Sequence, residues 1–256
     1  MAVRFLLALV RVNLLSSVAL RGNFLLQMFF MAFNNLIWFS VWWIYFTKFP
    51  EINGWKLPEA EAMYGFATAA FGLCVVFCAG SRQLAQRISE GELDALLVQP
   101  KNVMLQVIFS RSQPSGWGDI CSSVVFFSLS GYCTGWHLPL ILFCIFCGVC
   151  ILTCTAMNIG ALAFWLGPVD QLARQLFEFF VSFNAYPQTI YSSWFRLFLF
   201  TLIPAGFMTF VPVELLRDFH WTHLLALVCF VPIYVAATIF IFQSGLRRYE
   251  SGNKLI

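Results

Sequence analysis

The chain has 256 residues, of which 60% are hydrophobic and only 11% are charged, and its mean hydropathy is +0.79. An average soluble domain is about 25% charged, so this chain has too few polar side chains to cover a water-facing surface, and a soluble enzyme is excluded. An aromatic content of 18% excludes a disordered chain. The small net charge of +3 gives no reason to expect nucleic acid as a partner.

The longest apolar region contains no Asp, Glu, Lys or Arg between Asp119 and Asp170. A membrane helix needs about 20 apolar residues, so this region alone is long enough for two. A transmembrane barrel would show alternating strands of about ten residues, and the unbroken apolar runs do not have that pattern. The sequence therefore predicts an all-α polytopic membrane protein, folded as a single transmembrane domain over residues 1–256.

Residues 1–21 combine Arg4, Arg11 and Arg21 with many apolar side chains. Arg4 and Arg11 are seven residues apart and share a helical face, which is typical of an amphipathic elbow helix lying on the membrane surface. A cleaved signal peptide is the alternative. Arg11 and the polar residues after it interrupt the apolar stretch, however, and no A-x-A cleavage pattern follows.

Six apolar segments follow this first helix and predict six transmembrane helices. The predicted spans are residues 24–46, 61–80, 119–136, 140–166, 170–186 and 221–243. Trp42, Trp43 and Tyr45 end the first span as an aromatic belt at the water boundary. Asp119 is expected to cap the N-terminus of the third span.

Residues 187–218 are also apolar, but Pro187, Pro204, Gly206 and Pro212 divide them into short pieces. Each piece is too short for a full crossing of the bilayer. Such pieces predict short re-entrant helices that dip into the outer leaflet between spans five and six.

The positively charged residues are unevenly distributed, which predicts the orientation in the membrane. If the N-terminus is cytoplasmic, 11 Lys or Arg residues lie inside and 4 lie outside. The inside residues are Arg4, Arg11, Arg21, Arg82, Arg87, Lys101, Arg111, Arg174, Arg247, Arg248 and Lys254, and the outside residues are Lys48, Lys56, Arg196 and Arg217. The bias predicts that both termini are cytoplasmic.

The second and third spans are joined by the longest polar stretch, residues 81–118. Within it, Ser89 and Glu92 match the capping-box pattern S-x-x-E, and acidic residues occupy the first turns, where the helix dipole favours them. Pro100 ends the helix, because the residue before a proline avoids the α region. We therefore predict a cytoplasmic helix of about nine residues.

Leu93, Leu96 and Leu97 would lie on one apolar ridge of that helix. Such a ridge suits a groove on a soluble partner protein. A helix lying flat on the lipid surface is the alternative, but acidic side chains are disfavoured beside anionic headgroups.

Residues 90–94 (EGELD) and 99–102 (QPKN) together resemble the loop between spans two and three of ABC-2 type, or type V exporter-like, ABC transporter permeases. The resemblance is to a bacterial branch of about this length, whose loop reads G-E-L-D-x-L-L-x-x-P. Residues 203–207 (IPAGF) and the tail 245–252 (GLRRYESG) are similar to that branch as well.

The resemblance implies the membrane subunit of an ATP-driven exporter, working with two copies of a separate ATP-binding subunit and with a second permease unit, identical or related. That partner would bind ATP and Mg, and this chain would hold no cofactor. The expected location is the bacterial cytoplasmic (inner) membrane, in contact with lipid. The sequence itself agrees with the expectation that ATP binds to a partner subunit, because it contains no G-x-x-x-x-G-K-[ST] phosphate loop.

The resemblance also implies two sets of site residues. The coupling helix would contact the ATP-binding subunit through Glu90, Glu92, Leu93, Asp94, Leu96, Leu97 and Gln99. The second and fifth spans would line the translocation path, which places there Tyr64, Phe66, Thr68, Phe71, Phe177, Phe180, Phe183 and Asn184. Asn34 and Asn35, polar at mid-membrane depth, are candidates for the same path or for interhelical hydrogen bonds.

The sequence is also compatible with two other functions. An ion-coupled secondary transporter would need an ionisable group in a span, and Glu178 is the candidate, although an i,i+4 ion pair with Arg174 is the simpler explanation. An intramembrane enzyme could use His137, His220 and His223, but no paired carboxylate or Ser/His arrangement accompanies them.

The sequence predicts no metal site. The cysteines at metal-like intervals are Cys144, Cys147, Cys150 and Cys154, and no His or carboxylate is interleaved with them. Buried cysteine commonly behaves as a small hydrophobic residue.

Overall fold

The computed structural model describes residues 2–52, 54–135, 137–186, 194, 200 and 204–249. The secondary structure of these residues is helical, apart from one isolated bridge between Ile52 and Trp55. The prediction of an all-α fold is confirmed.

A helix occupies the position of each predicted span. These helices are α2 (Arg21–Lys48), α3 (Leu57–Phe77), α7 (Ser115–Ser130), α8 (His137–Ala161), α10 (Asp170–Phe183) and α13 (Trp221–Leu246). Four are long and apolar enough to cross a membrane, namely α2, α3, α13, and α8 taken together with α9 (Ala163–Leu166). The other two, α7 and α10, have 16 and 14 residues, so the six-span arrangement stays a prediction.

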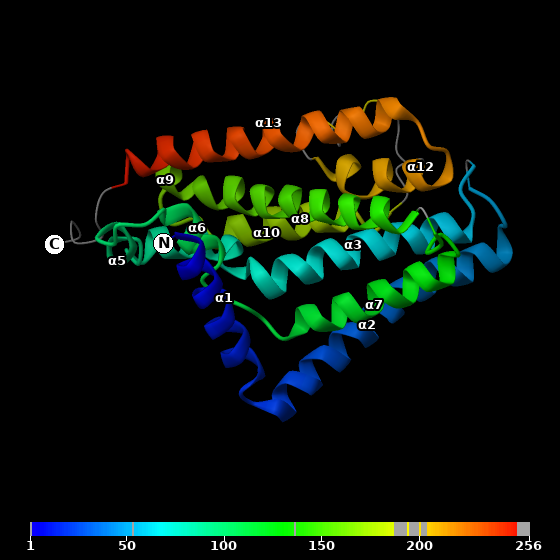
Figure 1. The fold of residues 1–256 in the computed structure, drawn as a ribbon, viewed down its shortest axis with the longest axis horizontal. Coiled ribbons are helices and arrows are strands. Elements are labelled where there is room, and N and C mark those ends of the chain that lie inside the picture. The colour runs from blue at the N-terminus through cyan, green and yellow to red at the C-terminus, as the bar shows by residue number, and fades with distance from the viewer. Residues whose placement is uncertain are drawn as a thin grey trace.

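The long helices run side by side along the longest dimension of the molecule (Figure 1). One end of the bundle holds the start of α1 (Ala2–Val18), α5 (Asp94–Leu97), α6 (Val103–Ile108) and the last turn of α13. The short helix α12 (Val211–Arg217) lies at the opposite end. The polar connection of residues 81–118 therefore shares one end with the N-terminus and with the end of α13, as the predicted topology requires.

The central helix of the bundle is α3, and α2 and α13 are peripheral. In the most apolar window of each helix, 78% of the residues are buried in α3, against 11% in α2 and 17% in α13. The peripheral helices expose large apolar side chains such as Phe29, Trp38 and Phe240. Surfaces of this kind suit contact with lipid or with another membrane subunit.

Three glycines allow α7 to approach α2 and α3 closely. A Cβ at Gly72 would lie 2.7 Å from the Gly116 carbonyl oxygen, and a Cβ at Gly116 would lie 2.7 Å from the Gly72 carbonyl oxygen. On the α2 side, a Cβ at Gly118 would collide with the Met28 carbonyl oxygen. Small residues are the usual means by which membrane helices bring their backbones together.

The first helix, α1, leaves the bundle at an angle (Figure 1). Asn13 Nδ2 donates a hydrogen bond to the Phe109 carbonyl oxygen at 2.8 Å, and the Lys101 ammonium lies 3.1 Å from the centre of the Phe5 ring. The side chain of Leu7 is exposed. A helix that exposes its leucines in this way has the surface expected at a membrane boundary.

Only part of the predicted re-entrant segment, residues 187–218, falls within the described residues. That part contains the π-helical turn η3 (Gly206–Phe210) and α12. End to end, these two elements span about 18 Å, which is too short to cross a bilayer, and they pack against α3, α8 and α13. The earlier portion of the segment, where the first of the short helices is predicted, lies outside the described residues except for residues 194 and 200.

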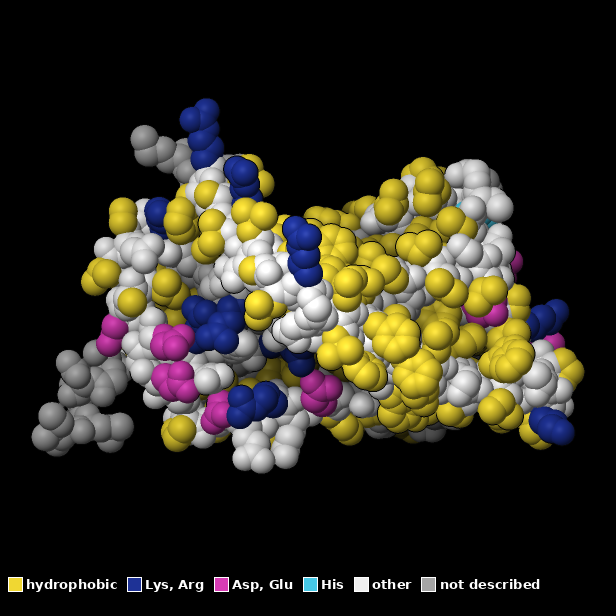
Figure 2. All heavy atoms as spheres, turned by 90° about the horizontal axis from the view of Figure 1, so that it is seen from below, with side chains coloured by type: hydrophobic (Ala, Val, Ile, Leu, Met, Phe, Trp, Pro, Cys, Tyr) yellow, Lys and Arg dark blue, Asp and Glu magenta, His cyan; other side chains and the backbone are white. Residues whose placement is uncertain are grey.

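The surface in Figure 2 is divided by residue type. Apolar side chains dominate its central part, and charged side chains gather toward the two ends, most of them at the end that holds α5 and α6. An apolar band between charged ends is the surface expected of a protein embedded in lipid.

We expect Gly118→Ala to destabilise the bundle, because the added methyl group would overlap the Met28 carbonyl group. The cost should be about 1–3 kcal/mol, the usual range for overpacking, and should appear as a lower thermal midpoint of the purified protein in detergent. Gly22→Ala in α2 is the control, since nothing lies within 4 Å of that position. Equal stability of the two variants would contradict the close packing of α7 on α2.

Candidate functional site

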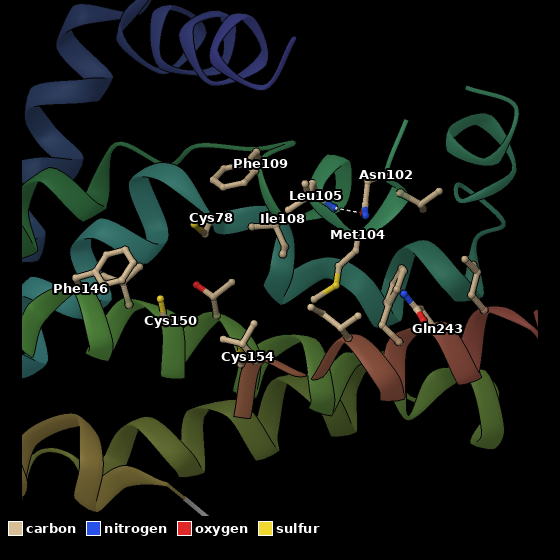
Figure 3. A pocket seen from close by; sticks show the side chains of 17 residues that line it. Cys78, Asn102, Met104, Leu105, Ile108, Phe109, Phe146, Cys150, Cys154 and Gln243 are labelled. Carbon is tan, nitrogen blue, oxygen red and sulfur yellow. Dashed lines mark hydrogen bonds between the residues drawn. The ribbon is translucent and has the colours of Figure 1, made fainter. Parts of the chain in front are cut away.

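The connection between α3 and α7 folds into a compact unit, which we call the coupling unit. It consists of η1 (Ala79–Gln83), α4 (Leu84–Ser89), α5 and α6. Gly80 packs so closely on α6 that a Cβ there would collide with the Val107 carbonyl oxygen. Asn102 caps α6 by accepting a hydrogen bond from the Leu105 backbone N–H at 3.1 Å (Figure 3).

The predicted coupling helix was wrong in its start and its length. Ser89 ends α4, and its hydroxyl donates to the Ala85 carbonyl oxygen at 3.0 Å instead of capping a new helix with Glu92. Gly91 then turns the chain with a φ of 72°, a left-handed conformation that breaks the helical run. Only the four residues of Asp94–Leu97 form α5.

The predicted contact residues divide between inward and outward positions. Leu93 is fully buried, Leu96 and Asp94 are half-buried, and Leu97 exposes 42% of its surface. The next residue, Val98, exposes 83%. The remaining predicted contacts, all exposed, are Glu90, Glu92 and Gln99. The three leucines therefore do not form a single outward ridge. Leu93 anchors the segment, and Leu97 with Val98 forms what we call the apolar tip.

Arg87 holds the turn of the coupling unit from within. The residue is buried, and its Nε lies 3.7 Å from Glu92 Oε2. Burial lowers the pKa of Arg87, and the negative charge of Glu92 opposes that shift. Because a buried cation needs a nearby counter-ion, Glu92 has a structural role inside the subunit.

The end of α13 packs on α9, and the residue Tyr249 beyond it reaches the coupling unit. A Cβ at Gly245 would collide with the Phe164 ring of α9, and the rings of Phe164 and Tyr249 have centres 6.2 Å apart. Burial, followed by the neighbouring Asp94 carboxylate, raises the pKa of Tyr249 to about 12. Residues of the C-terminal segment 245–252 therefore bring the last turn of α13 to α9 and place Tyr249 beside α5.

A cavity with a volume of about 320 Å³ brings together residues of α2, α3, α7 and α10, and we call it the polar cavity. Six of the predicted path residues line it: Asn34, Asn35, Tyr64, Thr68, Phe71 and Asn184. Glu178 and Asp119 line it as well. Residues from four separate parts of the chain therefore meet at one site.

The other predicted path residues lie elsewhere. Phe66, Phe177 and Phe180 are buried in the apolar core. Phe183 packs edge-to-face on Phe179, with ring centres 4.5 Å apart. None of these phenylalanines lines the polar cavity.

The helix α10 buries one face and exposes another. Ala173, Phe177 and Phe180 are spaced as one helical face and are buried. The exposed polar residues of the opposite face are Gln171, Arg174, Gln175, Glu178 and Ser182. Lipid cannot satisfy such groups, so a polar face on a membrane-embedded helix requires water or another protein subunit.

Asp119 has a different role from the predicted one. Because α7 begins at Ser115, Asp119 lies inside the helix and is not its N-cap. Asn35 Nδ2 donates to Asp119 Oδ1 at 2.7 Å and to Ser122 Oγ at 3.2 Å. The interhelical hydrogen bond considered for Asn35 is present. A lone acid at the edge of a long uncharged run was the signal that could have placed Asp119 in this site.

Glu178 pairs with Arg82, whereas the sequence predicted a pair with Arg174. Arg82 Nη2 lies 2.9 Å from Glu178 Oε1, whereas Arg174 pairs with the first residue of α10. The Arg82 guanidinium also lies 5.3 Å and 4.9 Å from the ring centres of Phe71 and Phe177, within cation–π range. One arginine therefore connects the coupling unit to α3 and α10.

A second cavity, of about 640 Å³, lies between α6, α8 and α13 (Figure 3). Its walls include Met104, Ile108, Phe146 and Cys150. It shares no lining residue with the polar cavity and has no charged residue in its lining. It therefore offers a mainly apolar surface and none of the predicted path residues.

The cysteines and histidines form no recognisable centre. The free thiols of α8 are Cys144, Cys147, Cys150 and Cys154. In the part of the chain that the structure describes, no group of three or more His, Cys, Asp or Glu side chains could hold a metal ion. His220 and His223 lie together at the start of α13, with ring centres 5.8 Å apart, and His137 begins α8.

The fold and these two sites define an all-α, multi-pass membrane protein with a polar cavity among its long helices and a compact unit at one end. The model of the ABC-2 family transporter protein matches residues 29–252. The chain therefore belongs to the ABC-2 transporter family, a membership that implies a permease subunit with an ATP-binding partner. Comparison with curated proteins gave no match, and comparison with solved structures gave none either.

We expect the Glu178→Gln variant to fold normally. Its transport, like that of the wild type, should not depend on a pH gradient. The Arg82–Glu178 pair is partly exposed, with 25% and 62% of the two side chains accessible, so its loss should lower the free energy of unfolding by about 1 kcal/mol or less. Transport by the reconstituted complex and thermal stability are the measurements, with Glu214→Gln of α12 as the control. A pH-gradient dependence present in the wild type and lost in Glu178→Gln would point to ion coupling instead.

Proposed function

We propose that this chain forms half of the membrane part of an ATP-driven exporter. Two permease units, identical or related, would enclose the translocation path, and two copies of an ATP-binding subunit would bind ATP and Mg. Membership of the ABC-2 family supports this assignment. The exposed polar face of α10 beside the polar cavity is the structural observation that carries it.

The translocation path would run along this face of α10 and through the polar cavity. Gln171, Gln175 and Ser182 are exposed on a helix expected to lie at membrane depth, where lipid offers them no hydrogen bonds. A second permease unit facing α10 would cover these side chains and leave a hydrated path between the two units. An ion-coupled secondary transporter has less support, because Arg82 already neutralises Glu178.

The proposed orientation places the coupling unit and both termini in the cytoplasm of a bacterial cell, with six spans in the cytoplasmic membrane. The excess of Lys and Arg in the inside segments supports it. In this orientation α1 lies at the inner surface as an elbow helix, and α12 belongs to a re-entrant segment at the outer surface.

The ATP-binding subunit would dock on the apolar tip, Leu97 and Val98. These side chains are exposed although they are apolar, and exposed acidic and polar residues surround them in sequence. Interfaces between soluble partners have this arrangement of an apolar centre within a polar rim. Leu93, buried behind the tip, would set its position without touching the partner.

We expect Leu97→Asp to detach the ATP-binding subunit while the permease itself remains at normal abundance in the membrane. An unpaired charge buried at the interface is strongly unfavourable, so the ratio of copurified ATPase to permease should fall about tenfold or more. ATP-driven transport should be lost to the same extent. Retention of the ATPase at wild-type stoichiometry would show that the tip does not dock there.

Two further variants make this result specific. Leu138→Asp introduces the same change at a similarly exposed leucine, 47% against 42% for Leu97, at the start of α8, and should leave the ATPase bound. Leu93→Asp should instead lower the abundance of the permease, because Leu93 is fully buried within the subunit.

A further inference from the structure

Asp119 carries a carboxylate oxygen that the subunit leaves without a partner. The residue is 1% exposed and lines the polar cavity. Its Oδ1 accepts the hydrogen bond from Asn35, whereas Oδ2 is buried with no hydrogen-bond partner in the described part of the chain. Burying a carboxylate is costly unless a charge or further donors compensate it. Asp119, a lining residue of the cavity, therefore has one buried acceptor oxygen that lacks a donor or cation.

The other charges near the cavity do not compensate Asp119. Glu178 is the second acid in the lining, and its partner Arg82, at 2.9 Å, balances it. Neither Lys nor Arg is among the lining residues. The Arg82 charge is within electrostatic reach of Asp119, but it is already matched by Glu178. An ionised Asp119 would therefore carry a negative charge that the lining residues leave unbalanced, and a bound cation would supply the missing counter-charge.

The walls of the cavity are rich in aromatic side chains. Trp38, Tyr64, Phe71 and Tyr186 all line it. Aromatic faces attract organic cations, and the attraction strengthens where water is excluded. An aromatic-walled cavity with one unbalanced carboxylate has the chemistry of a site for a cation with an apolar body.

We propose that the polar cavity binds an organic cation with an aromatic or apolar body, and that Asp119 is the counter-ion of its cationic group. This inference rests on the proposed transport function and adds to it the substrate class. An anion of the same size and shape is rejected by the same carboxylate.

The test uses the full-length permease in lipid nanodiscs and two probes of matched shape and opposite charge, tetraphenylphosphonium and tetraphenylborate. Equilibrium dialysis of the labelled probes measures binding, and empty nanodiscs of the same lipid correct for partition into the bilayer. We expect saturable binding of the cation with a Kd about tenfold or more below that of the anion, because charges interact strongly outside bulk water. Equal affinity for the two probes, or no saturable binding of the cation, overturns the proposal.

Variants of the cavity assign the binding to Asp119. Asp119→Asn keeps an oxygen for Asn35 and removes the charge, so the Kd for tetraphenylphosphonium should rise about tenfold or more. Asp218→Asn is the control, since that carboxylate lies beyond α12 and outside the cavity, and it should bind as the wild type does. Unchanged affinity in folded Asp119→Asn overturns the assignment.

Asn34→Asp keeps the test decisive if Asp119→Asn does not fold. It adds an acid to the same cavity and should lower the Kd for the cation. Failure of Asn34→Asp to tighten cation binding overturns the proposal as well.

Failure of this inference and failure of the exporter assignment are distinguishable. The dialysis uses the permease alone and needs no ATP, whereas the tip variant reports on the ATPase complex. If the ATPase copurifies in a way that depends on Leu97 but cation binding does not depend on Asp119, the proposed substrate class is wrong. The exporter assignment then still stands. If the chain binds the cation through Asp119 but binds no ATPase, the proposed ligand is supported and the exporter assignment is wrong.

Discussion

The close approach of α7 to both α2 and α3 is the constraint on which the rest of the structure depends. Gly116 meets the backbone of α3, and Gly118 meets that of α2, because neither carries a Cβ. The following residue is Asp119, and its Oδ1 thereby lies 2.7 Å from Asn35 Nδ2. With backbone contacts on both sides of α7, this carboxylate is held inside the bundle, and the polar cavity forms around it.

The order and approximate limits of the long helices could be predicted from sequence because membrane thickness and apolar length leave few alternatives. Asn35, Tyr64 and Thr68 were selected as candidates for one path, and they line one cavity. The family resemblance selects Tyr64 and Thr68 through their place in the second span, whereas Asn35 is selected because polar residues are costly on a lipid-facing side at membrane depth.

The structure departs from the predicted one where a turn residue or a distant contact overrides a local sequence pattern. Ser89 has the spacing of a cap, but the left-handed Gly91 interrupts the helix that it would begin. The sequence predicts Asp119 at a helix start, whereas α7 begins one turn earlier, at Ser115. The partner of Glu178 is Arg82, which is distant in sequence, so a rule based on neighbouring helical positions could not identify it.

The placement of Arg82 also has a mechanical consequence. Its guanidinium lies against Phe71 of α3 and Phe177 of α10 and is bonded to Glu178 of α10. A displacement of η1 would therefore act on both helices through this one side chain. Arg82 thus ties η1 of the coupling unit to two helices that line the polar cavity, although α3 and α10 are separated by more than ninety residues of sequence.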